Sequence, residues 1–183
     1  MIDKRIRKIS LKKTFYVISA IVMIPLLIFF YYQIKASLFV TAFIIANIAL
    51  SSYKKNFQFP IEIEILTLGI ILSTFLYGIK AGLLIAILGT ILSSAFYGYY
   101  SPFLIPMIIG NMLVALLTPL FFSTQLFLSG LILSMIKNGF VFIFYHFVFN
   151  YHIGKNLSFG ITNIIWNSLL FVNIAPILFT IMK

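Results

Sequence analysis

Two polar residues stand out within an apolar run of the sequence, because residues 123–149 hold Lys137 and Asn138 near their middle. An ionised lysine at the centre of a membrane costs at least about 2.5 kcal/mol, so it must face protein or a wet cavity. At the spacing of an α-helix, Ser134, Asn138 and Tyr145 share one stripe, at positions i, i+4 and i+11. These side chains could therefore line a polar surface inside a helical protein.

The last apolar run, residues 157–182, carries three asparagines and the only tryptophan of the chain. At about 100° per residue these four side chains fall within an arc of roughly 120° on one helix. Amide, indole and ammonium groups from two helices, set in apolar walls, make up a small-molecule site in which Lys137 would suit a carboxylate or phosphate. The candidate substrate-binding residues are Lys137, Asn138, Tyr145, Asn163, Trp166, Asn167 and Asn173.

A structural interpretation of the same residues stays open. Asparagines also bond across neighbouring helices and hold a bundle together, at about 0.6 kcal/mol each. Lys137 could pair with Glu62 or Glu64 instead of binding a ligand. These two acids follow Pro60, where a helix is predicted to begin, and a helix N-terminus favours negative side chains. We therefore expect both glutamates to be solvated residues of a helix start.

Other reactive groups are few. The chain has no cysteine, which excludes disulfides, thiolate metal sites and cysteine nucleophiles. His146 and His152 have no acidic neighbours in the sequence, so we expect no metal site and no cofactor. A His-Glu-x-x-His pattern and a Walker-type loop are absent, and the only aspartate is Asp3. The sequence therefore predicts a protein that is not an enzyme.

The elements that position these residues are predicted to be membrane helices. Of the 183 residues, 62% are hydrophobic and only 9% are charged, whereas about 25% are charged in a soluble domain. A transmembrane barrel needs alternating polar and apolar residues, which these runs lack. We expect an all-α fold, a polytopic transmembrane bundle of six to seven helices, with one domain over residues 14–183 and a basic tail over residues 1–13.

Seven apolar runs are candidates for membrane spans, which need about 20 residues each. Lys35 is predicted to separate the first two runs, and the second is short enough to leave six or seven crossings open. Pro119 is predicted to end the fifth run. The runs are residues 14–34, 36–51, 61–77, 81–97, 102–117, 123–149 and 157–182.

The formal net charge is +10, and six of the thirteen basic residues crowd the N-terminal tail. Basic residues gather on the cytoplasmic side of a membrane, beside anionic lipid headgroups. The pattern predicts a lipid bilayer as the partner of the tail, with a cytoplasmic N-terminus and no nucleic acid bound. Abundant Ile, Phe, Lys and Asn with only two arginines indicate an AT-rich prokaryotic genome, hence the plasma membrane of a prokaryotic cell.

Pairs of small residues one helical turn apart let helix backbones approach closely. Gly130 and Ser134 form such a pair, which we expect to pack inside the bundle. Ala42 and Ala46 form another, which could instead be an outward docking face for a second membrane subunit.

Residues 59–117 combine an apolar helix, a Gly-x-x-x-Gly turn around a basic residue, and a Gly-punctuated helix that ends in an aromatic, Gly-rich loop. The residues that carry this pattern are Gly78, Lys80, Gly82, Gly89, Tyr97, Gly98, Tyr99 and Tyr100. The stretch resembles the substrate-binding subunits (S components) of energy-coupling factor (ECF) vitamin transporters. The same pattern, together with the size and the basic tail, is similar to that of MreD-type rod-shape membrane proteins.

The transporter resemblance implies a compact helical bundle that captures a vitamin or a similar small molecule for uptake. It implies a transmembrane coupling subunit, docking on Ala42 and Ala46, and ATPases as further partners. It also implies a substrate near the outer ends of the later helices, under residues 97–101 and 150–156. The MreD-like resemblance implies instead a non-transporting scaffold protein of the cell-shape or envelope machinery.

Overall fold

The computed structural model describes most of the chain, and the described residues contain helices and connections but no strand. The chain divides into two units, residues 1–35 and residues 36–183. In the first unit, the ammonium of Lys35 lies 5.9 Å from the centre of the Tyr31 ring. The described residues are Ser19, Met23, Pro25, 30–52, 61–96, Gly98, 101–121 and 125–183.

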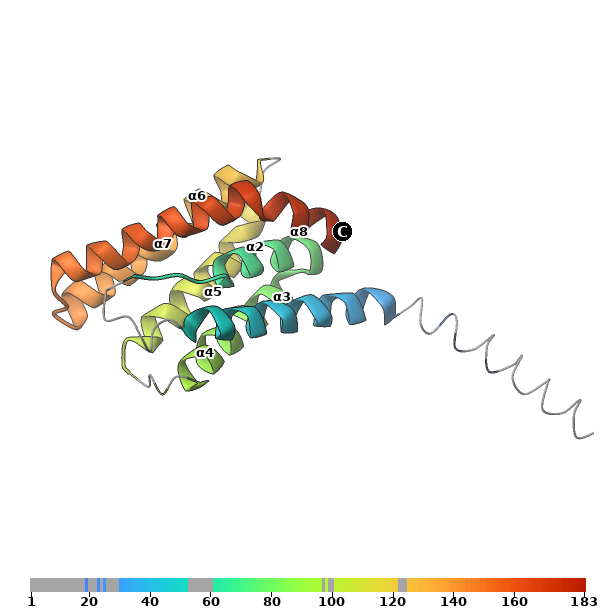
Figure 1. Ribbon diagram of the computed structural model, residues 1–183, viewed down its shortest axis with the longest axis horizontal. Helices are drawn as coiled ribbons and strands as arrows, with labels where there is room; N and C mark the ends of the chain where they lie inside the picture. Colours follow the sequence, from blue (N-terminus) through green and yellow to red (C-terminus); the bar gives the residue numbers. More distant parts are fainter. Residues whose placement is uncertain are drawn as a thin grey trace, which may run out of the picture. The chain divides into compact units, whose positions relative to one another are not determined.

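The second unit is a bundle of helices joined by short connections (Figure 1). It includes residues 36–50 of the helix Phe30–Leu50. Its further elements are α2 (Leu66–Tyr77), α3 (Ile79–Leu84), the π-helical turn η2 (Ile85–Gly89), α4 (Thr90–Phe96), α5 (Leu104–Phe121), α6 (Leu126–Ile143), the π-helical turn η3 (Phe144–Val148), α7 (Ile153–Asn173) and α8 (Ala175–Met182). The turn η2 joins α3 and α4 into one helix, and η3 extends α6.

Several of these helices have membrane character. Among the described residues, four are long and apolar enough to cross a membrane: Phe30–Leu50, Ile79–Phe96, Leu104–Phe121 and Leu126–Val148. Helices α7 and α8 meet at a bend of 55° and would form a fifth span together, while α2 is a shorter apolar helix. On α7, Ile161, Ile165 and Leu169 are each more than half exposed, a surface that suits lipid. The predicted all-helical fold is therefore confirmed for the described residues.

Two predicted boundaries are wrong. Lys35 does not separate two runs, because Phe30–Leu50 is one helix. Lysine is a good helix former whose long side chain carries the charge away from the helix axis, so the backbone bonds continue. Pro119 lies inside α5, because a proline in the last turn of a helix removes only one backbone bond. Most of the predicted run 14–34 lies outside the described residues.

The third predicted run also begins differently. Residues 61–64 are extended and run alongside α7, and α2 begins only after them (Figure 1). Side chains of other helices hold this extended backbone: the Glu62 N–H donates to the Thr162 hydroxyl (3.2 Å), and the Ile65 N–H donates to Asn47 Oδ1 (3.2 Å). These tertiary bonds replace the bonds of a first helical turn, so the predicted helix start at residue 61 is wrong.

Helix α2 is the most buried element of the bundle. Residues 66–74 are all buried, and Leu68, Ile70 and Ile71 have no exposed surface. A helix that is hydrophobic on every face must be enclosed. Of the residues just before α2, Glu62 and Glu64 are buried as well, whereas Ile61 is exposed.

Helices α6 and α7 approach closely at Gly130. A Cβ atom on Gly130 would lie 2.4 Å from the ring of Phe171 on α7. Ser134, one turn further along α6, has no exposed surface. The predicted packing of this small-residue pair inside the bundle is confirmed, and the contact brings the middle of α6 against α7.

Candidate functional site

The carboxylate of Glu64 is the centre of a buried polar cluster. Its Oε1 lies 2.8 Å from Nζ of Lys137 on α6, and each of the two side chains is only 4% exposed. The ammonium also donates to the hydroxyl of Thr67 on α2 (2.9 Å). The pairing of Lys137 with a glutamate, one of the two interpretations that the sequence leaves open, is thus present in the structure.

The first turn of α2 also binds the Glu64 carboxylate. The Thr67 N–H donates to Oε2 (3.0 Å), and the Thr67 hydroxyl donates to Oε1. A negative side chain is favoured there, because the first N–H groups of a helix have no partners of their own. The expected attraction to a helix start is thus present. The expectation that both glutamates are solvated is wrong, because Glu62 and Glu64 are each only 3% exposed.

Three asparagines complete the cluster. Asn167 donates to Glu64 Oε1 (3.1 Å), and the amide of Asn163 lies 3.4 Å from the same oxygen. Asn138 on α6 donates to Asn163 Oδ1 (2.8 Å), which also accepts from Asn167 (3.1 Å). We call this group the charge-pair cluster, and its members are Glu64, Thr67, Lys137, Asn138, Asn163 and Asn167.

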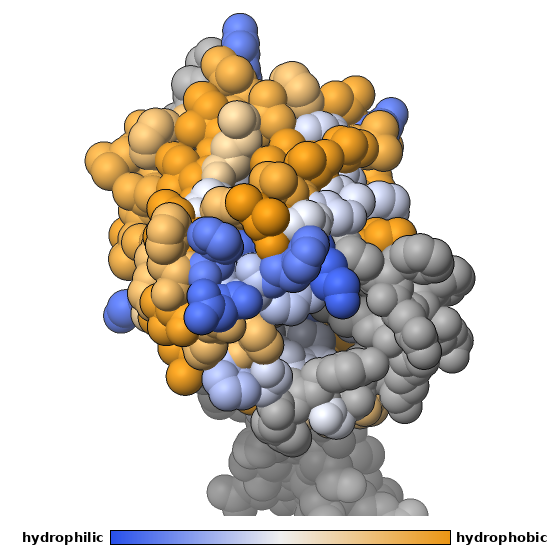
Figure 2. All heavy atoms as spheres, turned by 90° about the vertical axis from the view of Figure 1, so that its left-hand side faces the viewer, coloured by the Kyte–Doolittle hydropathy of each residue, from blue (hydrophilic) through white to orange (hydrophobic). Residues whose placement is uncertain are grey.

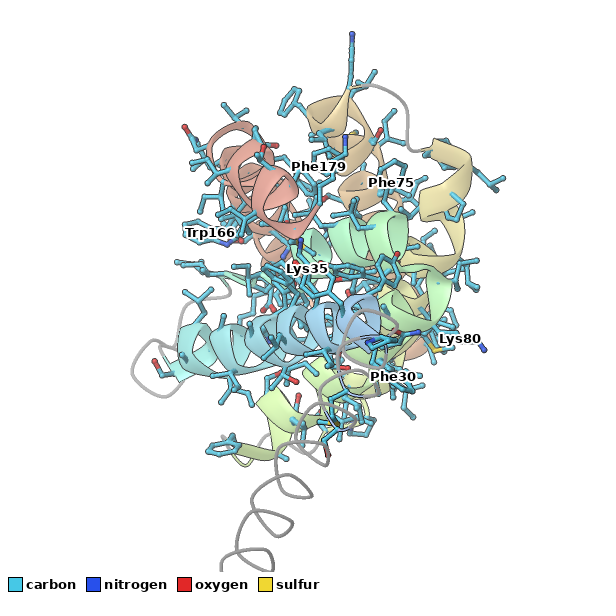
Figure 3. The ribbon with its side chains drawn as sticks, turned by 90° about the vertical axis from the view of Figure 1, so that its right-hand side faces the viewer. Phe30, Lys35, Phe75, Lys80, Trp166 and Phe179 are labelled. Atoms are coloured by element: carbon cyan, nitrogen blue, oxygen red, sulfur yellow. The ribbon has the colours of Figure 1, made fainter. Side chains whose placement is uncertain are left out.

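Trp166 fixes the backbone beside the charge-pair cluster. Its indole N–H donates to the carbonyl oxygen of Glu64 (2.8 Å), and Figure 3 shows its side chain beside the extended segment. Helix α7 therefore holds Glu64 through both its side chain and its backbone. The position of the carboxylate is thus determined by three helices at once.

The charge-pair cluster lies at the mid-length of the two long helices that supply most of it. Lys137 is the middle residue of the 23-residue helix Leu126–Val148. Asn163 is the middle residue of the 21-residue helix α7. If these helices cross a bilayer, the cluster lies near the centre of the hydrocarbon, where polar groups are costly and usually functional.

Three polar atoms at the charge-pair cluster have no hydrogen-bond partner in the described part of the chain. They are Oδ1 of Asn138, Oδ1 of Asn167 and Oγ of Ser134, and each is buried. Buried polar groups are nearly always paired, so each such atom requires an explanation. The usual explanation is a water molecule or a ligand that bonds to the buried atom.

Two of the candidate substrate-binding residues, Tyr145 and Asn173, bond to groups outside the charge-pair cluster. Tyr145 donates to the carbonyl of Phe103 (2.9 Å), and their rings meet edge to face. It lies two helical turns beyond Asn138, about 10 Å along the axis. Asn173 is exposed and donates to the carbonyl of Leu169 on its own helix (2.9 Å), just before the bend into α8.

The sequence interpretation missed Glu64 as the centre of the site. One available signal was the alternation of residues 61–65, in which two glutamates alternate with three isoleucines. Period-two alternation indicates extended backbone and places both acids on one face. That signal competes with the helix-start signal of Pro60, and only the contacts with α7 decide between them.

Hydrophilic side chains gather at the end of the bundle where α6 connects to α7, with hydrophobic surface around them (Figure 2). Asn150, His152 and Lys155 lie in this connection and in the first turn of α7, and all three are exposed. The His152 ring accepts from the Gly154 N–H (3.2 Å) and so caps α7. In the described ranges, no three His, Asp or Glu side chains gather where they could hold a metal ion.

Comparisons with protein-family models, curated proteins and solved structures found no match to this chain. The class is therefore defined by fold and site alone. The described residues form an all-helical fold with apolar helices long enough to cross a membrane, and the lysine of a buried ion pair lies at the mid-length of one of these helices.

Proposed function

We propose that this chain is the membrane substrate-binding subunit of a vitamin-type (energy-coupling factor) importer, which captures a small molecule for uptake. One observation carries the proposal. Lys137, Asn138, Asn163 and Asn167, from two different helices, converge on one buried region together with Glu64. A few placed donors and acceptors within an apolar bundle are the composition of a small-molecule site.

The broken segment before α2 supports a transport role. Irregular backbone at membrane depth is tolerated only where protein or a polar cavity surrounds it. Transporters commonly place the N-terminus of a half-length helix near the bilayer midplane, where it faces a charged group. Here the 12-residue helix α2 begins beside the charge-pair cluster, and residues 61–64 precede it as extended backbone.

The same segment favours six crossings. Residues 61–64 extend about 13 Å and α2 about 18 Å, together close to the roughly 30 Å of a hydrocarbon core. The Tyr77 hydroxyl donates to the carbonyl of Met182 (2.8 Å), and Phe75 and Phe179 meet with ring centroids 5.8 Å apart (Figure 3). These contacts agree with two segments that end on the same side of a membrane.

The orientation follows from charge. The basic tail favours a cytoplasmic N-terminus in a prokaryotic plasma membrane. With six crossings, Lys80 and Lys183 then lie inside and the α6–α7 connection lies outside. Substrate would enter from that polar outer end (Figure 2).

The Ala42–Ala46 pair is the proposed docking face for a transmembrane coupling subunit, which would link the chain to ATPases. Ala42 is exposed and Ala46 is half-buried. Small residues on a lipid-facing surface let a second helix approach closely.

A thermal-shift assay of the purified chain in detergent tests the capture role. A panel of water-soluble vitamins and their precursors is added singly, and at least one is expected to raise the midpoint of unfolding in a concentration-dependent way. The intrinsic fluorescence of Trp166, the only tryptophan, gives an independent binding signal. The absence of any response across the panel would argue strongly against the proposal.

A second candidate function is an MreD-like membrane scaffold of the cell-shape or envelope machinery. It is favoured by the mutual neutralisation of Glu64 and Lys137, which ties the segment before α2 to α6 without a ligand. Affinity purification from native membranes separates the two functions. A coupling subunit with ATPases supports the importer, and envelope-elongation proteins support the scaffold.

A further inference from the structure

We propose that the charge-pair cluster takes an uncharged solute rich in N–H or O–H groups, and not an anion. This inference rests on the proposed capture function and names its substrate class. It departs from the expectation, drawn from the sequence, that Lys137 would suit a carboxylate or phosphate.

The first step concerns charge. Glu64 already occupies the anion position beside Lys137, with 2.8 Å between the charged atoms. A ligand carboxylate would meet a second buried negative charge, and an unpaired charge away from water is strongly disfavoured. To replace Glu64, the ligand carboxylate would also have to break the bonds that Thr67 and Asn167 donate to Glu64. A cationic ligand would be repelled by the positive charge of Lys137, whereas a neutral solute is repelled by neither charge.

The second step concerns the two unpartnered amide oxygens. The amide nitrogen of Asn138 donates to Asn163 Oδ1 and to the carbonyl of Ser134, each 2.8 Å away. Both partners are acceptors, so turning the amide round would set oxygen against oxygen. The network therefore fixes the orientation and leaves Oδ1 as the unpartnered atom.

Asn167 follows the same logic. Its amide nitrogen donates to Glu64 Oε1 (3.1 Å), to the Asn163 carbonyl (3.0 Å) and to Asn163 Oδ1 (3.1 Å), which are all acceptors. Its Oδ1 is again the atom left over. Two buried amide oxygens thus require hydrogen-bond donors, which an ionised carboxylate or a fully ionised phosphate does not supply.

The third step concerns Ser134. Its buried hydroxyl lies one turn before Asn138 on α6 and has no partner in the described ranges. A hydroxyl both donates and accepts. The complementary ligand therefore presents two donors and one further polar group, as a primary amide, a lactam or a polyol does.

The experiment compares matched pairs of probes on the full-length wild-type protein in lipid nanodiscs. The pairs are nicotinamide against nicotinate, biotinamide against biotin, and pantothenol against pantothenate, at a pH where each acid is ionised. Binding is followed by the fluorescence of Trp166 and by the midpoint of thermal unfolding. We expect the neutral member of at least one pair to bind at least tenfold more tightly than its anionic partner.

Variants then locate the bound probe. Asn138→Ala and Asn167→Ala should each weaken binding of the neutral probe at least tenfold. Asn111→Ala is the matched control, because Asn111 is also a buried amide with an unpartnered Oδ1, but it bonds Thr90 on α4 (2.9 Å). It should leave the affinity unchanged.

The possible failures are distinguishable. Tighter binding of the anions would overturn this inference and leave the capture function standing. If the neutral probe binds tightly and its affinity is unchanged in both asparagine variants, the ligand lies elsewhere, and this inference is also overturned. No binding by any probe of either charge, together with no response to the wider vitamin panel, would remove the capture function itself. The wild-type comparison decides the charge preference even if the variants fail to fold.

Discussion

Lys137 of α6 meets Glu64, 73 positions earlier in the chain, with Nζ 2.8 Å from Oε1 and both side chains almost fully buried. The pair connects an extended segment to the middle of a long apolar helix. Removing one partner would leave an uncompensated charge in the bundle, so the two residues should behave as a unit. Their coupling is the first property that can be measured.

The losses of stability caused by removing each partner of the ion pair should not be additive. Lys137→Met leaves a buried carboxylate, and Glu64→Gln leaves a buried ammonium, each at a cost of about 3–5 kcal/mol. The double variant should lose clearly less than the sum of the two singles. The free energy of unfolding in mixed micelles measures all three.

Lys155→Met is the matched control for this cycle. Lys155 is exposed in the first turn of α7, so its loss should change the stability by less than about 0.5 kcal/mol. Strictly additive losses for Glu64→Gln and Lys137→Met would show that the two charges are not coupled.

Asn163 and Asn173 should respond differently to the same substitution, although both were candidates on one helix. Asn163→Ala removes the acceptor of Asn138 and Asn167 and should cost about 1–3 kcal/mol. Asn173→Ala removes only a bond to its own helix at an exposed position, and should cost less than about 0.5 kcal/mol. Chemical denaturation of both variants provides the comparison. Equal losses would remove the distinction between the buried cluster and the exposed surface of α7.

The contact between α6 and α7 should be sensitive to a single methyl group at Gly130. A Cβ there meets the Phe171 ring, so Gly130→Ala should destabilise by about 1–3 kcal/mol. Gly139→Ala, on the same helix with nothing within 4 Å of the new atom, should be neutral or slightly stabilising. Thermal unfolding midpoints of the two variants test this, and a tolerated Gly130→Ala would mean that the helices are not in close contact at this position.

The absence of native cysteine makes the proposed topology directly testable. Single cysteines replace Lys80, His152 and Lys183 in turn, and intact cells are treated with a membrane-impermeant maleimide. With six crossings and a cytoplasmic N-terminus, only His152→Cys should be labelled before the cells are lysed. Labelling of Lys80→Cys and not of His152→Cys would invert the orientation, and the cysteine-free parent serves as the blank.

The membrane character and the helical class were readable from the sequence, because they depend on composition summed over long segments. The convergence of Lys137 with Asn163 and Asn167 was also anticipated, since helical phase places such residues on one face of each helix. Helical phase does not determine which face of a helix packs against which other helix. Asn173 shows this limit, because it lies at the edge of the predicted arc and faces outward.

The sequence by itself indicated an apolar solvent around this chain. In such a solvent its few buried polar groups must find partners within the protein, because hydrocarbon offers none. The tertiary structure alone decided that Glu64 is the central partner. Residues 61–64 stay extended because side chains of other helices bond the backbone of residues 62–65. These side chains are Thr162, Asn47 and Trp166. Such long-range bonds outweigh a local helix-start preference, and local sequence patterns carry no information about them.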